Sequence, residues 1–394
     1  MVNCRRERLV ALCCIGAVLA SVFCSCVHEA CAQTKEIVLP RVSAEAAILL
    51  EWQTGTVLFE KRAFNRMYPA SLTKMMTALI ALERGRLEDV IQVSQDAATQ
   101  AGSSMNLRTG DKFTLEDLLY GLMLNSGNDA AWAIAEHMGK GSANTFIELM
   151  NQRAKELGAI NTRFQNPHGL SHPNHYTTAF DLALIAKTCL RHPYFKNLVG
   201  TKEKDVVEAD KNIVISLYNT NRLLWLHPGA DGVKTGTTQQ AGQCLVASAT
   251  RNGMRLLAVV LNSEDRWYDT STLLDYGFDN YRLAKAASAG ETIVTLPVSH
   301  STEKYVPVIC AKDLQACVPA RALGLRIEVD LPPVIRAPCS AGTIVGQATL
   351  CLGDRAVGYS DLIAGTWAYP RTPWRLMARL GLSLFIHFRH LGLF

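Results

Sequence analysis

The stretch PASLTKMMTALIALE, residues 69–83, places a serine three residues before a lysine at the start of a helical pattern. Apolar residues recur along it at helical spacing, and Pro69 lies just upstream, where a helix can begin. Ser71 and Lys74 stand at positions i and i+3, so they share one face of the expected helix. The pair is either a nucleophile with its base or a helix cap followed by a surface lysine.

The composition around this stretch is that of a globular protein. Hydrophobic residues make up 48% of the 394-residue chain and charged residues 19%, and this length allows more than one domain of about 100–200 residues. The net charge is only +5, and the sequence has no run of lysine and arginine of the kind that grips phosphates. Nothing in the composition therefore supports nucleic acid as a partner.

Residues 1–32 are typical of a secretory signal peptide. A basic start, MVNCRRERLV, precedes an apolar run, and the tripeptide ACA at residues 30–32 matches a cleavage site between small residues. We therefore predict an exported protein that works in the periplasm or outside the cytoplasm. The alternatives are an uncleaved membrane anchor and lipidation at Cys24 or Cys26.

Six cysteines follow the predicted signal peptide. Export permits disulfides, but the spacing does not give a pairing. No two of them have C-x-x-C spacing, so a zinc ribbon and a thioredoxin-like site lose support. The sequence does not show which of these cysteines, if any, form disulfides. The six are Cys189, Cys244, Cys310, Cys317, Cys339 and Cys351.

Residues 37–285 are interpreted as one α/β (α+β) domain in which helices flank an antiparallel sheet. AAILLEWQTGTVLFEKR predicts two strands around a turn, and QCLVASATRNGMRLLAVVLN predicts a hairpin at Asn252-Gly253 beside a strand in GADGVKTGTT. TLEDLLYGLMLNSGNDAAWAIAEHM predicts two helices broken by NSGND. A helix capped by Thr178 is expected next, and a last helix over residues 269–287.

The pattern changes twice after this domain. Five short strand-like stretches, separated by glycine, proline or charge, predict a small all-β domain over residues 288–368 with no catalytic constellation. Residues 370–394 form a basic amphipathic pattern, with apolar residues on one face of the expected helix and arginines on the other. Such a helix suits an anionic membrane surface, and the alternative is a helix that packs on the protein itself.

Three short motifs occur in a fixed order. A lone S-x-x-K is weak evidence, because this chain has a second copy from Ser301 to Lys304. The first copy, however, opens a helix at Ser71, an S-x-N at Ser126 falls in a break between helices, and the one K-T-G begins at Lys234 on an expected strand. This order and context are those of serine enzymes that recognise penicillin.

On these motifs the chain resembles the D-alanyl-D-alanine carboxypeptidases among the low-molecular-mass penicillin-binding proteins. The resemblance also covers NPHGL, YNTNRLLW and LDYGF, and it runs from about Ala47 to the C-terminal pattern. It implies a catalytic domain of the β-lactamase/transpeptidase type, followed by the family's usual all-β domain and amphipathic helix. It also implies peptidoglycan stem peptides and β-lactam antibiotics as ligands, and no metal or organic cofactor.

The residue types fit an acyl-transfer reaction. Ser71 would attack the carbonyl between two terminal D-alanines, and Lys74 would take its proton. Removing the proton from a free lysine at pH 7 costs about 4–5 kcal/mol of free energy. Burial, a helix N-terminus and a second cation at Lys234 would lower that cost. Ser126 would pass a proton to the leaving amine, which completes the expected catalytic group.

A second group of residues is expected to bind the substrate. Asn128 would hold the peptide backbone, and Lys234 would pair with the terminal carboxylate. Gly236 would let its strand approach the substrate closely. The family implies an oxyanion hole formed by the backbone N–H groups of Ser71 and Thr237. The complete set is Asn128, Lys234, Thr235, Gly236 and Thr237.

Several other interpretations compete with this one. His168, His172 and His175 lie close in sequence, but Pro173 breaks the segment and no metal-ligand spacing on a helix is present, so they are interpreted as turn residues. A class A-type serine β-lactamase would need a Glu-x-x-Leu-Asn stretch, which is absent between Ser126 and Lys234. A DD-endopeptidase would use the same catalytic residues, so the motifs do not separate it from a carboxypeptidase. A non-catalytic scaffold would not need these residues, so their presence argues against it. The sequence therefore predicts a membrane-associated serine DD-carboxypeptidase that trims stem pentapeptides.

Overall fold

The computed structural model describes residues 38–211 and 213–372. The predicted signal peptide, and the predicted membrane-surface helix beyond residue 372, lie outside these ranges. No helix among the described residues has the length and apolar character needed to cross a membrane.

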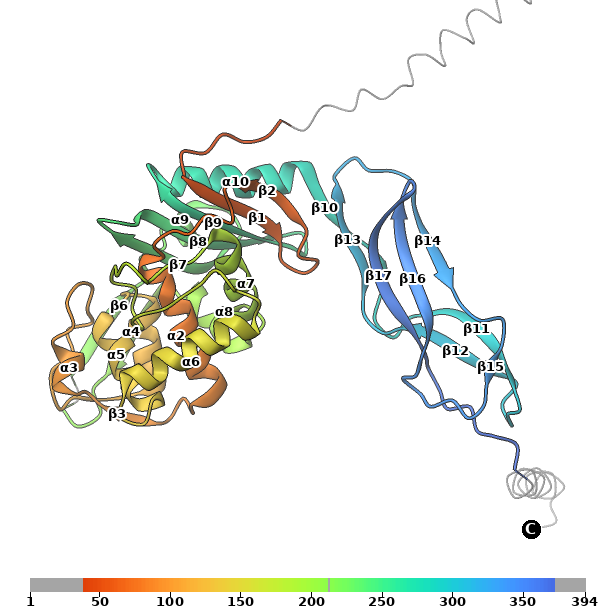
Figure 1. The fold of residues 1–394 in the computed structure, drawn as a ribbon, viewed down its shortest axis with the longest axis horizontal. Helices are drawn as coiled ribbons and strands as arrows, with labels where there is room; N and C mark the ends of the chain where they lie inside the picture. The colour runs from red at the N-terminus through yellow and green to blue at the C-terminus, as the bar shows by residue number, and fades with distance from the viewer. Residues whose placement is uncertain (1–37, 212, 373–394) are drawn as a thin grey trace, which may run out of the picture. The chain divides into compact units, whose positions relative to one another are not determined.

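A five-stranded antiparallel sheet forms the frame of the first domain (Figure 1), with the strand order β2-β1-β9-β8-β7. The predicted hairpin is confirmed, because Arg251 pairs with Met254 across Asn252 and Gly253, which both have positive φ. The predicted strand pair before the Ser71 motif is also confirmed. The strands are β1 Ala46–Glu51, β2 Val57–Lys61, β7 Ala230–Thr238, β8 Gly242–Arg251 and β9 Met254–Ser263.

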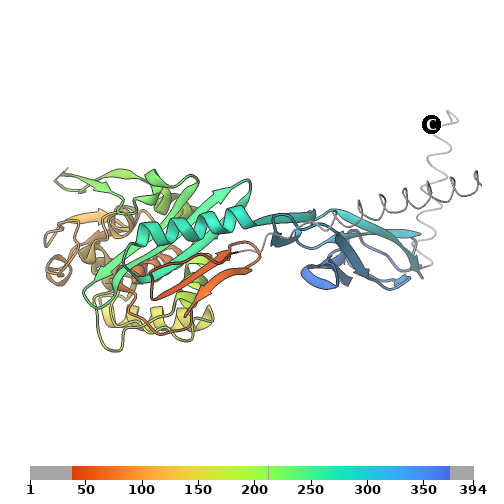
Figure 2. The same ribbon diagram turned by 90° about the horizontal axis from the view of Figure 1, so that it is seen from above.

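Helices cover both faces of this sheet (Figures 1 and 2). One long helix, α10, lies on one face, and the remaining main helices pack on the other. The main helices are α2 Lys74–Arg84, α4 Leu115–Met123, α5 Asn128–Met138, α6 Ala143–Glu156, α7 Ala179–Cys189, α8 Pro193–Gly200 and α10 Arg266–Asn280. Shorter elements are η1 Ala70–Thr73, α3 Gln95–Ala98, α9 Leu223–Leu226, the β3–β4 pair (Val90–Gln92, Lys112–Thr114) and the β5–β6 pair (Glu203–Val207, Val214–Tyr218).

The predicted helix starts are set by side-chain caps. Thr114 and Asp117 form a capping box at the start of α4, in which each side chain bonds the other residue's backbone N–H. The Thr178 hydroxyl accepts a hydrogen bond from Asp181 N at the start of α7, as the sequence predicts. The predicted break between α4 and α5 is also present, over residues 124–127.

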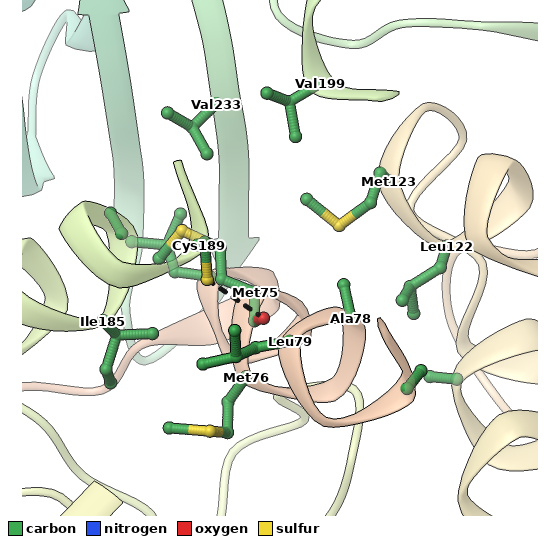
Figure 3. Close-up of a cluster of buried hydrophobic side chains, with 14 of the residues drawn as sticks. Met75, Met76, Ala78, Leu79, Leu122, Met123, Ile185, Cys189, Val199 and Val233 are labelled. Atoms are coloured by element: carbon green, nitrogen blue, oxygen red, sulfur yellow. Dashed lines mark hydrogen bonds between the residues drawn. The ribbon is translucent and has the colours of Figure 1, made fainter. Parts of the chain in front are cut away.

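Helix α2 is buried in the middle of the helical layer. Every residue from Lys74 to Ala81 is buried, so this helix has no solvent face along its first two turns. Figure 3 shows its apolar side chains among those of α4, α7 and β7, where the Cys189 thiol donates a hydrogen bond to Met75 O at 3.5 Å. Dense packing of this kind holds the preceding turn, which carries Ser71, in a fixed position.

The predicted all-β domain is confirmed, with three strands more than the five expected. A six-stranded sheet has the order β14-β16-β17-β12-β11-β15, and β10 pairs with β13 in a separate antiparallel ladder. The core contains Val306, Val308, Leu350 and Leu362. The strands are β10 Tyr281–Ala287, β11 Thr292–Ser299, β12 Tyr305–Cys310, β13 Leu314–Pro319, β14 Leu325–Asp330, β15 Ile335–Arg336, β16 Ile344–Leu352 and β17 Arg355–Ala364.

The predicted helix over residues 269–287 is wrong in its last third. Helix α10 ends at Asn280, and residues 281–287 form strand β10, whose Ala284 and Ala287 join the β-domain core. Pairing with β13, from Tyr281 opposite Pro319 onward, overrides the helical propensity of this alanine-rich segment. We therefore propose a domain boundary close to residue 281 rather than at residues 285–288.

The six cysteines after the predicted signal peptide are all unpaired and buried in the described residues. The four in the β-domain, which the sequence leaves as candidates for disulfides, are buried as small apolar side chains, and two of them, Cys310 and Cys339, belong to its hydrophobic core.

Candidate active site

Ser71 and Lys74 lie in one tight turn at the head of α2. Ser71 is in the 3₁₀ turn η1, and Lys74 is the first residue of the α-helix. No side-chain hydrogen bond caps either element, and Lys74 has no solvent exposure. The alternative in which Ser71 is a cap and Lys74 a surface lysine is therefore wrong.

The Lys74 amine is surrounded by oxygen atoms. Its Nζ lies 3.2 Å from Ser71 Oγ and donates to Asn128 Oδ1 at 2.6 Å and to His168 O at 2.9 Å. The other end of the Asn128 amide donates to Ala101 O at 2.5 Å. The sequence predicts Asn128 as a substrate ligand, and the structure shows that it also fixes the position of Lys74.

The electrostatic environment disfavours a charged Lys74. Burial lowers the pKa of this amine well below its usual value, and the positive charge of Lys234 lowers it further. The carboxylate of Asp129 acts in the opposite direction but does not reverse the shift. A lysine with this surrounding can be a neutral base near pH 7.

Lys234 is a second buried lysine in the same site. It is 1% exposed, and its Nζ makes no hydrogen bond within the part of the chain that the structure describes. No hydrogen bond therefore joins Lys234 Nζ to the Ser126 hydroxyl in this structure. Burial lowers the pKa of Lys234 to about 7, with a further contribution from the positive charge of Arg266. An amine with these properties is well placed to receive an anionic group.

We expect Lys234→Met to make the protein more stable while it loses turnover. The folded pKa of Lys234 lies below that of a free lysine, so the cost of burying its charge is present in full below pH 7 and disappears as pH rises toward 10. The free energy of unfolding should therefore rise by about 1–3 kcal/mol at pH 6, and by less at pH 9. Denaturant titrations at both pH values measure this. A gain that grows with pH would contradict this account.

Strand β7 brings the K-T-G motif next to the nucleophile. A Cβ added at Gly236 would lie 3.1 Å from both Ser71 N and Pro69 O, so a glycine avoids a tight contact there. The buried Thr235 hydroxyl shares a 2.7 Å hydrogen bond with Thr220, from the YNTNRLLW segment. The predicted residues of β7 and η1 therefore do come together.

Arg266 is a site residue that the sequence reasoning missed. Its guanidinium donates to Thr237 Oγ1 at 2.6 Å, and to Gly236 O at 2.9 Å and Cys244 O at 3.1 Å. It lies at the start of α10, about thirty positions after the K-T-G motif, and no local pattern marks it. Only the packing of α10 on β8 and β9 places this cation beside Thr237.

The turn that carries Ser126 is held in an unusual conformation. Ser126 has a φ of 62° and lies just before α5. Asp129, one residue beyond the S-x-N motif, accepts hydrogen bonds from Ser104 Oγ at 2.5 Å and from the backbone N–H groups of Met105 and Leu107 at 3.1 Å. This carboxylate ties the loop before α4 to the Ser126 turn.

The three histidines have separate roles in local structure. His168 bonds Gln100 through Nε2 and stacks on Trp132, and its backbone oxygen is the Lys74 acceptor described above. His172 is exposed, and His175 is buried against Thr73. No group of three metal-ligating side chains is arranged around a common point in residues 38–211 and 213–372.

The family models that match the chain cover both of its domains. Residues 32–265 match the model described as D-alanyl-D-alanine carboxypeptidase, and residues 281–366 match the C-terminal domain of penicillin-binding protein 5. The second match begins at the first residue of strand β10.

Curated proteins from two distant bacteria are similar over most of the chain. The D-alanyl-D-alanine carboxypeptidase DacF of Bacillus subtilis (strain 168) is 35% identical over 331 residues, which are 82% of this chain and 85% of that protein. The D-alanyl-D-alanine carboxypeptidase DacC of Escherichia coli (strain K12) is 35% identical over 341 residues, or 82% of this chain and 84% of that protein.

A solved structure gives the same result for the fold. Penicillin-binding protein 5 from Haemophilus influenzae has a TM-score of 0.75 and 31% sequence identity, and the match covers 84% of this chain and 99% of that one. The chain therefore belongs to the D-alanyl-D-alanine carboxypeptidase family of low-molecular-mass penicillin-binding proteins, and it is a serine-type carboxypeptidase, a hydrolase of cell-wall biogenesis.

Proposed function

We propose that the enzyme removes the terminal D-alanine from peptidoglycan stem pentapeptides through an acyl-enzyme on Ser71. The main support for this assignment is the set of hydrogen bonds around Lys74 Nζ. A neutral amine has two N–H donors and one lone pair. The oxygens of Asn128 and His168 accept the two N–H groups, which leaves the lone pair for the Ser71 proton at 3.2 Å.

The remaining residues have roles that follow from charge and position. The buried amine of Lys234 has no hydrogen-bond partner among residues 38–211 and 213–372, and it can bind the terminal carboxylate of D-Ala-D-Ala or of penicillin. Thr235 and Thr237 lie on the same strand and add hydroxyl groups. Ser126 delivers a proton to the leaving D-alanine. The carbonyl oxygen of the scissile bond is stabilised by the backbone N–H groups of Ser71 and Thr237.

The direct test is hydrolysis of a diacetylated L-Lys-D-Ala-D-Ala peptide by the mature chain, with release of D-alanine measured over time. We expect one D-alanine per peptide and no further cleavage. In parallel, excess benzylpenicillin should give a covalent adduct of one drug molecule per chain in intact-mass spectra, and this adduct should decay slowly.

Other outcomes would favour the competing functions. Rapid loss of the drug with little adduct would indicate a β-lactamase, since such enzymes hydrolyse the acyl-enzyme quickly. Cleavage of cross-linked dimeric peptides into monomers, without release of D-alanine from the tripeptide, would indicate an endopeptidase. A folded protein that forms no adduct and releases no D-alanine would be the scaffold, and our proposal would be wrong.

We further propose that the chain works outside the cytoplasm at the surface of a membrane, bound through the basic residues near its C-terminus. Three arginines beyond the described residues, Arg375, Arg379 and Arg389, are expected on the polar side of the amphipathic pattern. Each basic residue near an anionic surface contributes about 1 kcal/mol of binding free energy. The export signal predicted for residues 1–32 agrees with this location.

Replacing all three arginines by glutamate should weaken binding to vesicles of anionic and zwitterionic lipids by at least about 100-fold, as measured by co-sedimentation. Hydrolysis of the soluble peptide should stay at the wild-type rate, because these residues are far along the chain from the catalytic motifs. Unchanged vesicle binding would contradict the proposed role of this segment, and so would equally strong binding of the wild type to purely zwitterionic vesicles.

A further inference from the structure

The residue before the nucleophile has an unusual backbone conformation. Ala70 has a φ of 48°, in the left-handed region that side-chain-bearing residues rarely adopt. Such a conformation persists only where surrounding contacts fix it, and it is often found at functional sites. The contacts that fix Ala70 therefore control the position of Ser71.

One peptide unit joins Ala70 to Ser71, and its two polar groups are linked geometrically. In a trans peptide the C=O and the N–H point in opposite directions, and this bond is not among the cis bonds of the structure. If the Ala70 carbonyl is held on one side, the Ser71 N–H must point to the other. That N–H is one of the two donors proposed above for the oxyanion hole.

The Ala70 carbonyl is held by a chain of buried hydrogen bonds. The Thr73 hydroxyl donates to Ala70 O at 2.9 Å, and the same hydroxyl lies 2.9 Å from His175 Nε2. On the far side of the ring, Gln165 N–H donates to His175 Nδ1 at 3.3 Å. Because Nδ1 accepts, Nε2 carries the proton and donates to Thr73, whose own proton goes to Ala70.

The surroundings of His175 keep this arrangement in one protonation state. The side chain is 1% exposed, and the Phe164 ring packs edge-on against it at 5.7 Å. Burial lowers the pKa of His175 to about 3, with a smaller contribution from His172. The imidazole is therefore neutral at every pH at which the enzyme would be assayed, and its Nε2–H donor is always present.

Two glycines complete the packing around the same peptide unit. A Cβ at Gly169 would lie 1.8 Å from Ala70 O, so the backbone of the NPHGL segment packs directly against the Ala70 carbonyl. A Cβ at Gly236 would lie 3.1 Å from Ser71 N, so strand β7 lies on the amide side. The amide therefore faces the K-T-G strand, where the second proposed oxyanion donor, the N–H of Thr237, is located.

We propose that His175 is a positioning residue, which acts through the Thr73 hydroxyl and the Ala70 carbonyl to aim the Ser71 N–H at the developing oxyanion. This inference rests on the proposed acyl-enzyme mechanism and extends it to a side chain that does not touch the substrate. An oxyanion donor acts in the transition state rather than in substrate binding. Loss of the positioning chain should therefore lower kcat and leave KM nearly unchanged.

The test compares His175→Ala, Thr73→Val and the double variant in the full mature chain, with kcat and KM measured for D-alanine release from the diacetylated tripeptide. We expect each single variant to lower kcat by about 10–100-fold, with KM within about twofold of wild type. Because both residues act along one chain, the double variant should be no slower than the slower single variant. His175→Gln keeps a donor at the position of Nε2 and should recover most of the rate.

Two controls separate positioning from general stability. His172→Ala removes an exposed histidine three residues away and should leave kcat unchanged. Thr73→Ser keeps the hydroxyl and should approach the wild-type rate, so the comparison of Thr73→Ser with Thr73→Val decides the question even if His175→Ala fails to fold.

Three results would overturn the inference. They are wild-type kcat in folded Thr73→Val, independent losses that multiply in the double variant, and a loss that appears mainly in KM. Failure of the wild type to release D-alanine would instead count against the proposed function itself.

Discussion

Ser71→Ala should form no covalent adduct with benzylpenicillin and should release D-alanine at a rate lower by about 10⁴-fold or more. Without the Ser71 hydroxyl, no acyl-enzyme can form on this residue. The folded structure should persist, because Lys74 keeps its hydrogen bonds to Asn128 and His168 when the serine oxygen is removed. Intact-mass spectra and thermal unfolding of the same sample measure both expectations.

The chain offers a matched control for this variant in its second S-x-x-K. Ser301 is buried in the β-domain, where its hydroxyl donates to Tyr369 O at 2.8 Å. Ser301→Ala should therefore form the penicillin adduct at the wild-type rate. An adduct that persists in Ser71→Ala, or that disappears in Ser301→Ala, would show that the acylated residue has been assigned incorrectly.

The contrast between these two motifs explains why the catalytic residues can be predicted from the sequence. S-x-x-K alone does not distinguish Ser71 from Ser301, but its order relative to Ser126 and Lys234 does. The motifs also carry their own local structure, because a helix start, a break between helices and a strand each leave a pattern in the sequence. Three segments that are far apart along the chain can therefore be assigned to one site from their sequence patterns alone.

The residues that the sequence patterns miss depend on tertiary packing alone. Arg266 reaches Thr237 only because α10 packs on the sheet, and His175 reaches Thr73 only because the loop after NPHGL folds back on η1. Neither contact leaves a periodic or local signal. The strand at residues 281–287 is missed for the same reason, since pairing with a segment about thirty residues later decides its conformation.

Lys74→Met should slow acylation by benzylpenicillin by about 10²–10⁴-fold, the usual contribution of a general base. Methionine fills a similar volume without an amine, so the buried head of α2 should stay packed. Lys304→Met, in the second S-x-x-K, is the matched control and should acylate at the wild-type rate. Stopped-flow measurement of adduct formation on the three proteins gives the comparison. A wild-type rate in Lys74→Met would mean that another group takes the Ser71 proton.

The dependence of the acylation rate on pH separates the two lysines. Burial and the charge of Lys234 lower the pKa of Lys74, so its amine becomes an active base as pH rises through that lowered value, and the rate should rise with it. Lys234 has a pKa of about 7, and above it the site loses the charge that binds the carboxylate, so the rate should fall again. In Lys74→Met the rising limb should disappear while the falling limb remains, because only the second depends on Lys234. A rising limb that persists without Lys74 would assign the base to a different residue, whereas loss of both limbs would mean that the charge on Lys234 does not control binding of the drug.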